Sequence, residues 1–167
     1  LAQLSQNTLL LSKLEHMETI RNKVRYRLDE QIRNCVILML PSFEEKRIKL
    51  AVELPEIWYT GNEEILEEIW VNLLDNARKY SPEGTAVFVE GKATEEYIRI
   101  EVRYEGQGMD EDTRQHLFDR YYQGDTSHET AGFGLGLSIV KRIVDLCKGS
   151  IRVESTLGKG TSIFIYL

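Results

Sequence analysis

The sequence has few of the features that mark membrane, secreted or nucleic-acid-binding proteins. Its most apolar run, residues 36–40, is far shorter than the roughly 20 residues of a membrane-spanning helix. The chain opens on an amphipathic, polar-studded segment instead of the basic and apolar blocks of a signal peptide. Its 21 Lys and Arg residues against 27 Asp and Glu residues give a net charge of −6, without a dense basic cluster. We therefore expect a cytoplasmic segment that contacts neither nucleic acid nor a membrane.

Cysteine and glycine are also scarce. The two cysteines, Cys35 and Cys147, lie in apolar, helix-like stretches without His or Cys at metal-ligand spacing, so we expect reduced core residues. Only 12 of 167 residues are Gly and 42% are hydrophobic, which excludes a disordered or repetitive chain. A chain of this length buries about 70% of its unfolded surface, as one globular domain does.

The first 28 residues differ in pattern from the rest. Residues 1–18 carry an apolar helical seam of Leu4, Leu11, Leu14 and Met17, and no other segment of the chain is an evident partner for it. We expect residues 19–28 to be a linker and residues 29–167 to form the main domain. An unpartnered seam should pair with a second copy of the chain, as a homodimer or a segment-exchanged dimer.

The main domain alternates helical and strand patterns. Expected helices cover residues 29–45, with Asp29 as the N-cap and with Pro41 as a bend or break, then a stretch that starts after Asn62, and residues 112–118 and 135–147. Expected strands cover residues 48–54, 57–59, 85–92, 97–104, 150–154 and 161–166, with a glycine- and serine-rich loop at 123–132. This arrangement predicts a two-layer α/β sandwich with about five strands and three larger helices.

The predicted helix after Asn62 has a polar face of Asn72, Asn76, Lys79 and Tyr80. Asn is a poor helix former, so two of them in mid-helix need a reason beyond a solvated surface. Two carboxamide oxygens one turn apart can bind a hard cation such as Mg²⁺, which takes its other ligands from water and substrate phosphates. Lys79 is then placed to neutralise phosphate charge.

Three glycine turns lie beside regular elements, at residues 106–108, 132–136 and 158–160. The turn at 132–136 precedes a helix, and glycines there let free backbone N–H groups approach a phosphate. By itself this spacing fits simple tight turns equally well. It matches neither the dinucleotide fingerprint nor a P-loop.

Taken together and in order, these motifs resemble the N box, glycine boxes and F box of the ATP-binding catalytic domain of sensor histidine kinases. The motifs are Asn72-x-x-x-Asn76, Gly106-x-Gly108, Phe118-Asp119-Arg120-Tyr121-Tyr122, Gly132-Phe133-Gly134-Leu135-Gly136-Leu137 and Gly158-x-Gly160-Thr161. Upstream, residues 9–15 are similar to the end of the second helix of that family's dimerisation hairpin. The resemblance implies the GHKL type of α/β sandwich, with ATP and Mg²⁺ between the N-box helix and a lid.

The resemblance also implies roles for individual residues. Asn76 and Asn72 would bind Mg²⁺, and Asn72, Lys79 and Arg120 would take part in phosphoryl transfer, although a surface salt bridge remains an equal reading of Arg120. The residues expected to contact the nucleotide are Asn72, Asn76, Lys79, Tyr80, Tyr104, Gly106, Gly108, Tyr122, Gly132, Gly134, Leu135, Gly136, Leu137 and Thr161. Related ATPases such as gyrase carry a Glu at the position of Asn72 to activate water. An Asn there favours transfer to a histidine over hydrolysis.

Two positions depart from the family pattern. The first glycine box normally begins with an Asp that accepts a hydrogen bond from the adenine amino group, and Tyr104 stands there instead. Losing that bond costs roughly 1.5–3 kcal/mol, or about 10- to 150-fold in affinity, so we expect weak or absent ATP binding. Glu105 is one residue out of register and should point to the other face of its strand.

The second departure concerns the phosphoacceptor histidine, because none of the three histidines fits its motif. His16 is followed by Met17 and Glu18 without the proline of the motif, and we expect it to be a surface residue at a helix end. The acceptor would therefore lie in the dimerisation domain outside this chain, and the phosphate would pass on to a response regulator. The parent protein could be an inner-membrane sensor.

Overall fold

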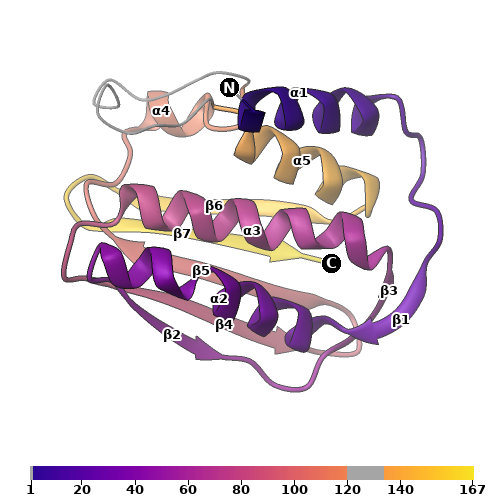
Figure 1. The fold of residues 1–167 in the computed structure, drawn as a ribbon, viewed down its shortest axis with the longest axis horizontal. Coiled ribbons are helices and arrows are strands. Elements are labelled where there is room, and N and C mark those ends of the chain that lie inside the picture. The colour runs from indigo at the N-terminus through magenta and orange to yellow at the C-terminus, as the bar shows by residue number, and fades with distance from the viewer. Residues whose placement is uncertain (1, 120–133) are drawn as a thin grey trace.

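The computed structural model describes residues 2–119 and 134–167 and shows a mixed five-stranded sheet with helices on one face (Figure 1). The strand order is β2-β4-β5-β7-β6, in which β2 runs parallel to β4 and the other neighbours are antiparallel. The strands are β2 (Lys49–Glu53), β4 (Ala86–Ala93), β5 (Ile98–Glu105), β6 (Ser150–Thr156) and β7 (Gly160–Tyr166). The predicted α/β sandwich is confirmed.

Three helices, α2 (Leu28–Glu45), α3 (Glu63–Tyr80) and α5 (Gly136–Leu146), cover the inner face of this sheet (Figure 1). The alternation along β5 explains why this face is inside, since Ile100, Val102 and Tyr104 are buried there. Trp70 on α3 and Ile143 on α5 are buried in the same core. Helix α3 begins directly after Asn62, as predicted, and the Asn62 side chain caps it by accepting a hydrogen bond from the Ile65 N–H.

Helix α1 (Ala2–Glu15) lies along the outside of α5 (Figure 1). The apolar seam predicted to lack a partner in this chain therefore has one, and that expectation was wrong. Leu11 and Leu14 are only 4% and 1% exposed. Arg142 on α5 donates hydrogen bonds to the carbonyl oxygens of Leu14, at 3.1 Å, and Met17, at 2.6 Å. The partner helix was missed because it comes more than a hundred residues later in the chain.

The expected linker contains a strand. Strand β1 (Val24–Arg27) pairs antiparallel with β3 (Trp58–Gly61) and so attaches residues 24–27 to the main domain. It was overlooked because three of its four residues are basic or aromatic, without a clear apolar alternation. The predicted N-cap of α2 was wrong, because the N-cap is Arg27 and Asp29 lies within the first turn, where its carboxylate accepts a hydrogen bond from the Ile57 N–H. Helix α2 also continues through Pro41 instead of splitting there.

The remaining described elements follow the expected pattern. A short helix, α4 (Glu111–Gln115), starts after the N-cap Asp110. Cys35 and Cys147 are both free thiols, and Cys35 is buried. None of the helices in residues 2–119 and 134–167 is long and apolar enough to cross a membrane. The predicted loop at 123–132 lies outside the described residues.

Candidate functional site

The candidate site lies at the C-terminal half of α3, where its polar face meets three other elements. The end of β5 with the turn after it, the start of α5 with the residues before it, and the start of β7 lie beside the predicted site residues of α3. They carry, in chain order, Tyr104, Gly106, Gly108, Gly134, Leu135, Gly136, Leu137 and Thr161. Arg120, Tyr122 and Gly132 lie outside the described residues. The structure thus brings the described part of the predicted set together on one side of the molecule.

The side-chain N–H groups of the two asparagines of α3 both have hydrogen-bond acceptors in the protein. Asn72 Nδ2 donates to the carbonyl oxygen of Glu68 at 2.7 Å, and Asn76 Nδ2 donates to the Tyr104 hydroxyl at 3.2 Å. Within the described part of the chain, no group donates a hydrogen bond to either Oδ1. A Cβ at Gly136 would lie 2.9 Å from Asn72 Oδ1, so the glycine leaves room beside that oxygen. Two free carboxamide oxygens one helical turn apart suit a hard cation such as Mg²⁺.

Lys79 and Tyr80 extend the same face toward the end of α3. Lys79 Nζ lies 3.0 Å from Asp75 Oδ2, and Arg78 donates to the same carboxylate at 2.7 Å. Burial by itself would raise the pKa of Asp75, but the hydrogen bonds from Arg78 and Lys79 outweigh it and lower the pKa. Asp75 is therefore an anion, and its ion pair with Lys79 positions the Lys79 ammonium group on this face. Burial, followed by the charge of Asp75, raises the pKa of Tyr80.

The glycine turns pack tightly against this region. A Cβ at Gly106 would lie 2.7 Å from the carbonyl oxygen of Tyr80, and a Cβ at Gly108, where φ is +69°, would lie 2.1 Å from that of Thr156. The N–H of Gly158 donates to the carbonyl oxygen of Gln107 at 2.7 Å, which joins the first glycine turn to the β6–β7 turn. These turns therefore connect the end of α3 to the end of the sheet.

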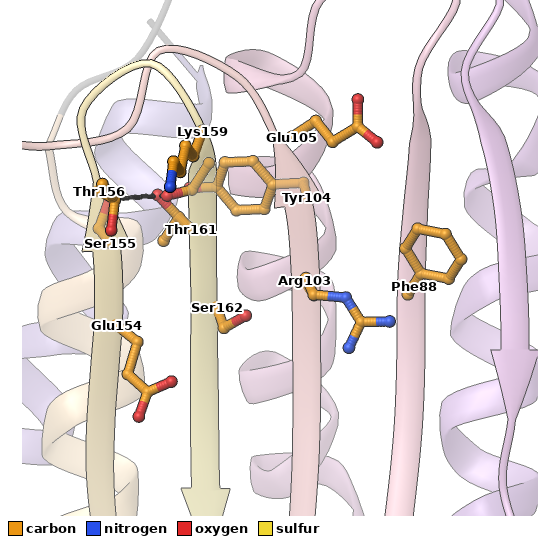
Figure 2. A pocket seen from close by; sticks show the side chains of 11 residues that line it. Phe88, Arg103, Tyr104, Glu105, Glu154, Ser155, Thr156, Lys159, Thr161 and Ser162 are labelled. Carbon is orange, nitrogen blue, oxygen red and sulfur yellow. Dashed lines mark hydrogen bonds between the residues drawn. The ribbon is translucent and has the colours of Figure 1, made fainter.

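Tyr104 lies in the middle of these elements. It is 5% exposed, and burial raises the pKa of its phenol to about 12, while hydrogen bonds to Thr161 and Asn76 act in the opposite direction. Figure 2 shows its ring directed from β5 toward Thr161 and Ser155, while Glu105 points away, as its register predicts. A neutral phenol therefore occupies the space between the predicted ligands Asn76 and Thr161.

A groove of about 400 Å³ opens beside this cluster on the outer side of the sheet. Its lining includes Tyr104 and Thr161 from the candidate site and, on the uncovered face of the sheet, Phe88, Arg103, Glu154 and Ser162 (Figure 2). Phe88, Arg103, Ser162 and Glu154 are opposite one another in the strand register, on the face that the helices do not cover. The groove therefore opens on the outer face of the sheet and shares Tyr104 and Thr161 with the candidate site.

Two residues that shape the site were not singled out in the sequence. Lys46 Nζ donates to the carbonyl oxygens of Arg78, at 2.8 Å, and Lys79, at 3.0 Å, and so fixes the last turn of α3. No sequence signal connects it with residues 32 and 33 positions later. Ser155 contacts Thr161, and its position could have been noticed because it continues the inward-facing series of Ile151 and Val153 on β6.

Comparison with known proteins identifies the family. Residues 61–167 match the model of the histidine kinase-, DNA gyrase B- and HSP90-like ATPases. The sensor histidine kinase YvrG of Bacillus subtilis is 43% identical over 125 residues, which are 74% of this chain and 20% of that protein.

Solved structures agree with that match. The crystal structure of full-length ShkA in complex with AMPPNP has a TM-score of 0.86 and 27% identity, over 98% of this chain and 35% of that one. Histidine kinase ThkA in complex with the response regulator TrrA shares the fold, with a TM-score of 0.82 and 17% identity over 99% of this chain and 47% of that one. This chain thus spans a fifth to about half the length of these three proteins. It belongs to the histidine kinase-, DNA gyrase B- and HSP90-like ATPase family, and within it to the catalytic domains of the sensor histidine kinases.

Proposed function

We propose that this chain binds ATP with Mg²⁺ and transfers the γ-phosphate to a histidine that lies outside it. The observation that carries this proposal is the pair of carboxamide oxygens of Asn72 and Asn76, to which no group in the described residues donates a hydrogen bond, with Gly136 beside Asn72 Oδ1. The two asparagines would hold Mg²⁺, which supplies positive charge against the phosphates. Lys79 would add a second positive charge, and the AMPPNP bound to ShkA supports an adenine nucleotide as the ligand.

The acceptor is proposed to be a histidine and not water because of Asn72. A carboxamide has no basic lone pair at neutral pH, and the N–H group of Asn72 is already committed to the carbonyl oxygen of Glu68. Asn72 can therefore bind a cation but cannot take a proton from water. Hydrolysis would require a base at this position.

We further propose that the acceptor histidine belongs to the dimerisation domain of a homodimeric parent kinase and that a response regulator receives the phosphate. His16 does not fit as the acceptor, since it is exposed and its Nδ1 lies 2.7 Å from the carbonyl oxygen of Ser12 at the end of α1. The ThkA–TrrA complex supports a response regulator as partner. Helix α1 would be the end of the dimerisation hairpin, and the segment would work in the cytoplasm.

Nucleotide binding in this chain is proposed to be weak because of Tyr104. Its neutral phenol cannot replace a carboxylate as acceptor, and its ring lies between Asn76 and Thr161. Loss of a hydrogen bond to a charged group corresponds to roughly 10- to 150-fold in affinity before any steric effect. A role as a nucleotide-free scaffold is the outcome to expect if binding is absent altogether.

Isothermal titration with AMPPNP and Mg²⁺ tests both parts of this proposal. We expect Tyr104→Asp to bind at least about 10-fold more tightly than the wild-type chain. Tyr104→Phe is the matched control, because it keeps the ring and supplies no acceptor, so it should not gain affinity. Micromolar binding by the wild-type chain would refute the role of Tyr104. Absence of binding in Tyr104→Asp, with unfolding temperature unchanged, would refute the nucleotide site itself.

A further inference from the structure

The five-stranded sheet has an unpaired edge at β2, the first strand in its order (Figure 1). Lys49 is in register with Ala86 of β4, and its N–H donates to the carbonyl oxygen of Thr85 at 3.1 Å. Lys49 therefore turns its backbone groups toward β4. Since backbone groups alternate in direction along a strand, Leu50 and Val52 turn theirs away from the sheet. No group in residues 2–119 and 134–167 bonds to these outward-pointing N–H and C=O groups.

The two ends of β2 carry opposite charges on the outer face of the sheet. Lys49 and Glu53 are both exposed, and neither has an ion-pair partner in the part of the chain that the structure describes. Glu53 is in register with Glu90, and Glu90 with Glu101, which is an unfavourable row of like charges. Arg103 pairs with Glu90 at 3.2 Å and with Glu101 at 3.3 Å. Glu53 thus lacks the positive neighbour that a further strand could supply.

Helix α2 places exposed apolar side chains beside the same edge. Arg33 Nη2 donates to the carbonyl oxygen of Leu54, directly after β2, at 2.7 Å, so this side of α2 faces the edge. Ile37 and Leu40 follow Arg33 by about one and two turns on the same side of the helix, and they are 64% and 37% exposed. The edge of β2 is therefore flanked by an apolar strip.

We propose that β2 is an interface with a second copy of this chain, in which two β2 strands pair antiparallel about a two-fold axis at Ala51. Lys49 then lies opposite Glu53 of the second copy, and symmetry repeats this ion pair on the other side of the axis. Leu50 lies opposite Val52 of the second copy. Because both turn their backbone groups outward, each such pair exchanges both N–H···O bonds.

The charge pattern and the hydrogen-bond pattern select the same register. A shift by one residue would place Leu50 opposite Ala51 of the second copy, whose backbone groups face β4, and the bonds across the interface would be lost. In the proposed register the two-fold axis is perpendicular to the sheet. Both α2 helices therefore stay on one face of the joined sheet, where Ile37 and Leu40 of the two copies come together.

Sedimentation equilibrium of the wild-type chain tests whether this association occurs. Pairing of one short strand from each copy makes a small interface, so we expect a dimer with a Kd on the order of 100 μM. A chain that stays monomeric at roughly 1 mM would overturn the proposal.

Charge reversal tests the register. Lys49→Glu and Glu53→Lys should each weaken the dimer at least about 10-fold, because both ion pairs become repulsive contacts. An equal mixture of the two variants, or the double variant Lys49→Glu/Glu53→Lys, should return to within about 3-fold of the wild-type Kd, since opposite charges again face each other. Lys148→Glu is the matched control, because Lys148 is exposed beside β6 at the opposite edge of the sheet, and it should leave the Kd unchanged.

Hydrogen exchange locates the interface. Between roughly 10 μM and 1 mM protein, exchange of the Leu50 and Val52 amides should slow about 4-fold, while the amides of β6 stay unaffected. Dimerisation without slower exchange at Leu50 and Val52 would show that the copies meet elsewhere and would refute the β2 interface. Dimerisation that the mixture of charge variants fails to restore would refute the proposed register.

Discussion

Docking of α1 on α5 can be tested at Arg142, whose guanidinium holds the end of α1 through two backbone carbonyl groups. Arg142→Met removes both hydrogen bonds and keeps the apolar stem of the side chain. Each bond from a partly buried guanidinium contributes about 1 kcal/mol after screening by solvent, so docking should weaken by about 2 kcal/mol. Leu11 and Leu14, almost fully buried, hold the rest of the interface.

Hydrogen exchange of the α1 amides measures this change, because a helix of 14 residues is marginal in water once it leaves its partner. A loss of 2 kcal/mol corresponds to roughly 30-fold faster exchange along α1. Amides in the middle of α3 should keep their protection. The undocked seam should also raise the fraction of dimer in solution at high concentration.

The matched control is Lys141→Met, the same substitution one residue earlier on α5. Lys141 forms only a surface ion pair with Asp145, with both side chains more than 40% exposed, so its loss should change α1 exchange by less than about 2-fold. Equal exchange in the two variants would refute the conclusion that Arg142 fastens α1. Dimerisation of the wild-type chain through the Leu11 and Leu14 side chains, which the docked structure buries, would likewise contradict docking within one chain.

Two further substitutions test residues that stabilise the fold around the site. The pKa of Asp29 lies below its usual range because Arg27 hydrogen-bonds to the carboxylate. The Asp29 carboxylate therefore stabilises the fold fully above pH about 4, and this stabilisation is lost as the pH falls through the lowered pKa. Asp29→Asn should cost about 2 kcal/mol at pH 7 in urea unfolding, and the difference from wild type should shrink in acid; a constant difference would disprove the ion-pair account. Gly108→Ala places a Cβ 2.1 Å from the carbonyl oxygen of Thr156 at a φ of +69°, so we expect it to lower stability by more than about 2 kcal/mol. Gly84→Ala, at a φ of +85° with nothing within 4 Å, should cost only about 1 kcal/mol, and equal unfolding temperatures for the two variants would show that crowding at Gly108 is not decisive.

Long periodic segments were predictable because their burial pattern is written in consecutive residues. Helix α3 follows from Asn62 at its start and from apolar spacing that includes Leu66 and Leu73, and the β4–β5 hairpin follows from alternation along both strands. Strand β1 was not predictable in this way, because its stability comes from pairing with β3 more than thirty residues later.

The sequence by itself determined which chemical groups the site contains. Two asparagines one turn apart, three glycine turns and the tyrosine at position 104 can be read without coordinates, and their order along the chain indicates the family. These residue types limit the reactions that the site can carry out, because the carboxamide of an asparagine binds a cation but does not act as a base.

Only the tertiary structure decided how those groups face one another. The partner of α1, the support of the α3 end by Lys46 and the contact of Asn76 with Tyr104 all depend on residues that are distant in sequence and meet only when the sheet and helices pack. The contact between Asn76 and Tyr104 is the clearest case. The two residues are 28 positions apart in the sequence, and their side chains meet because α3 packs beside the end of β5.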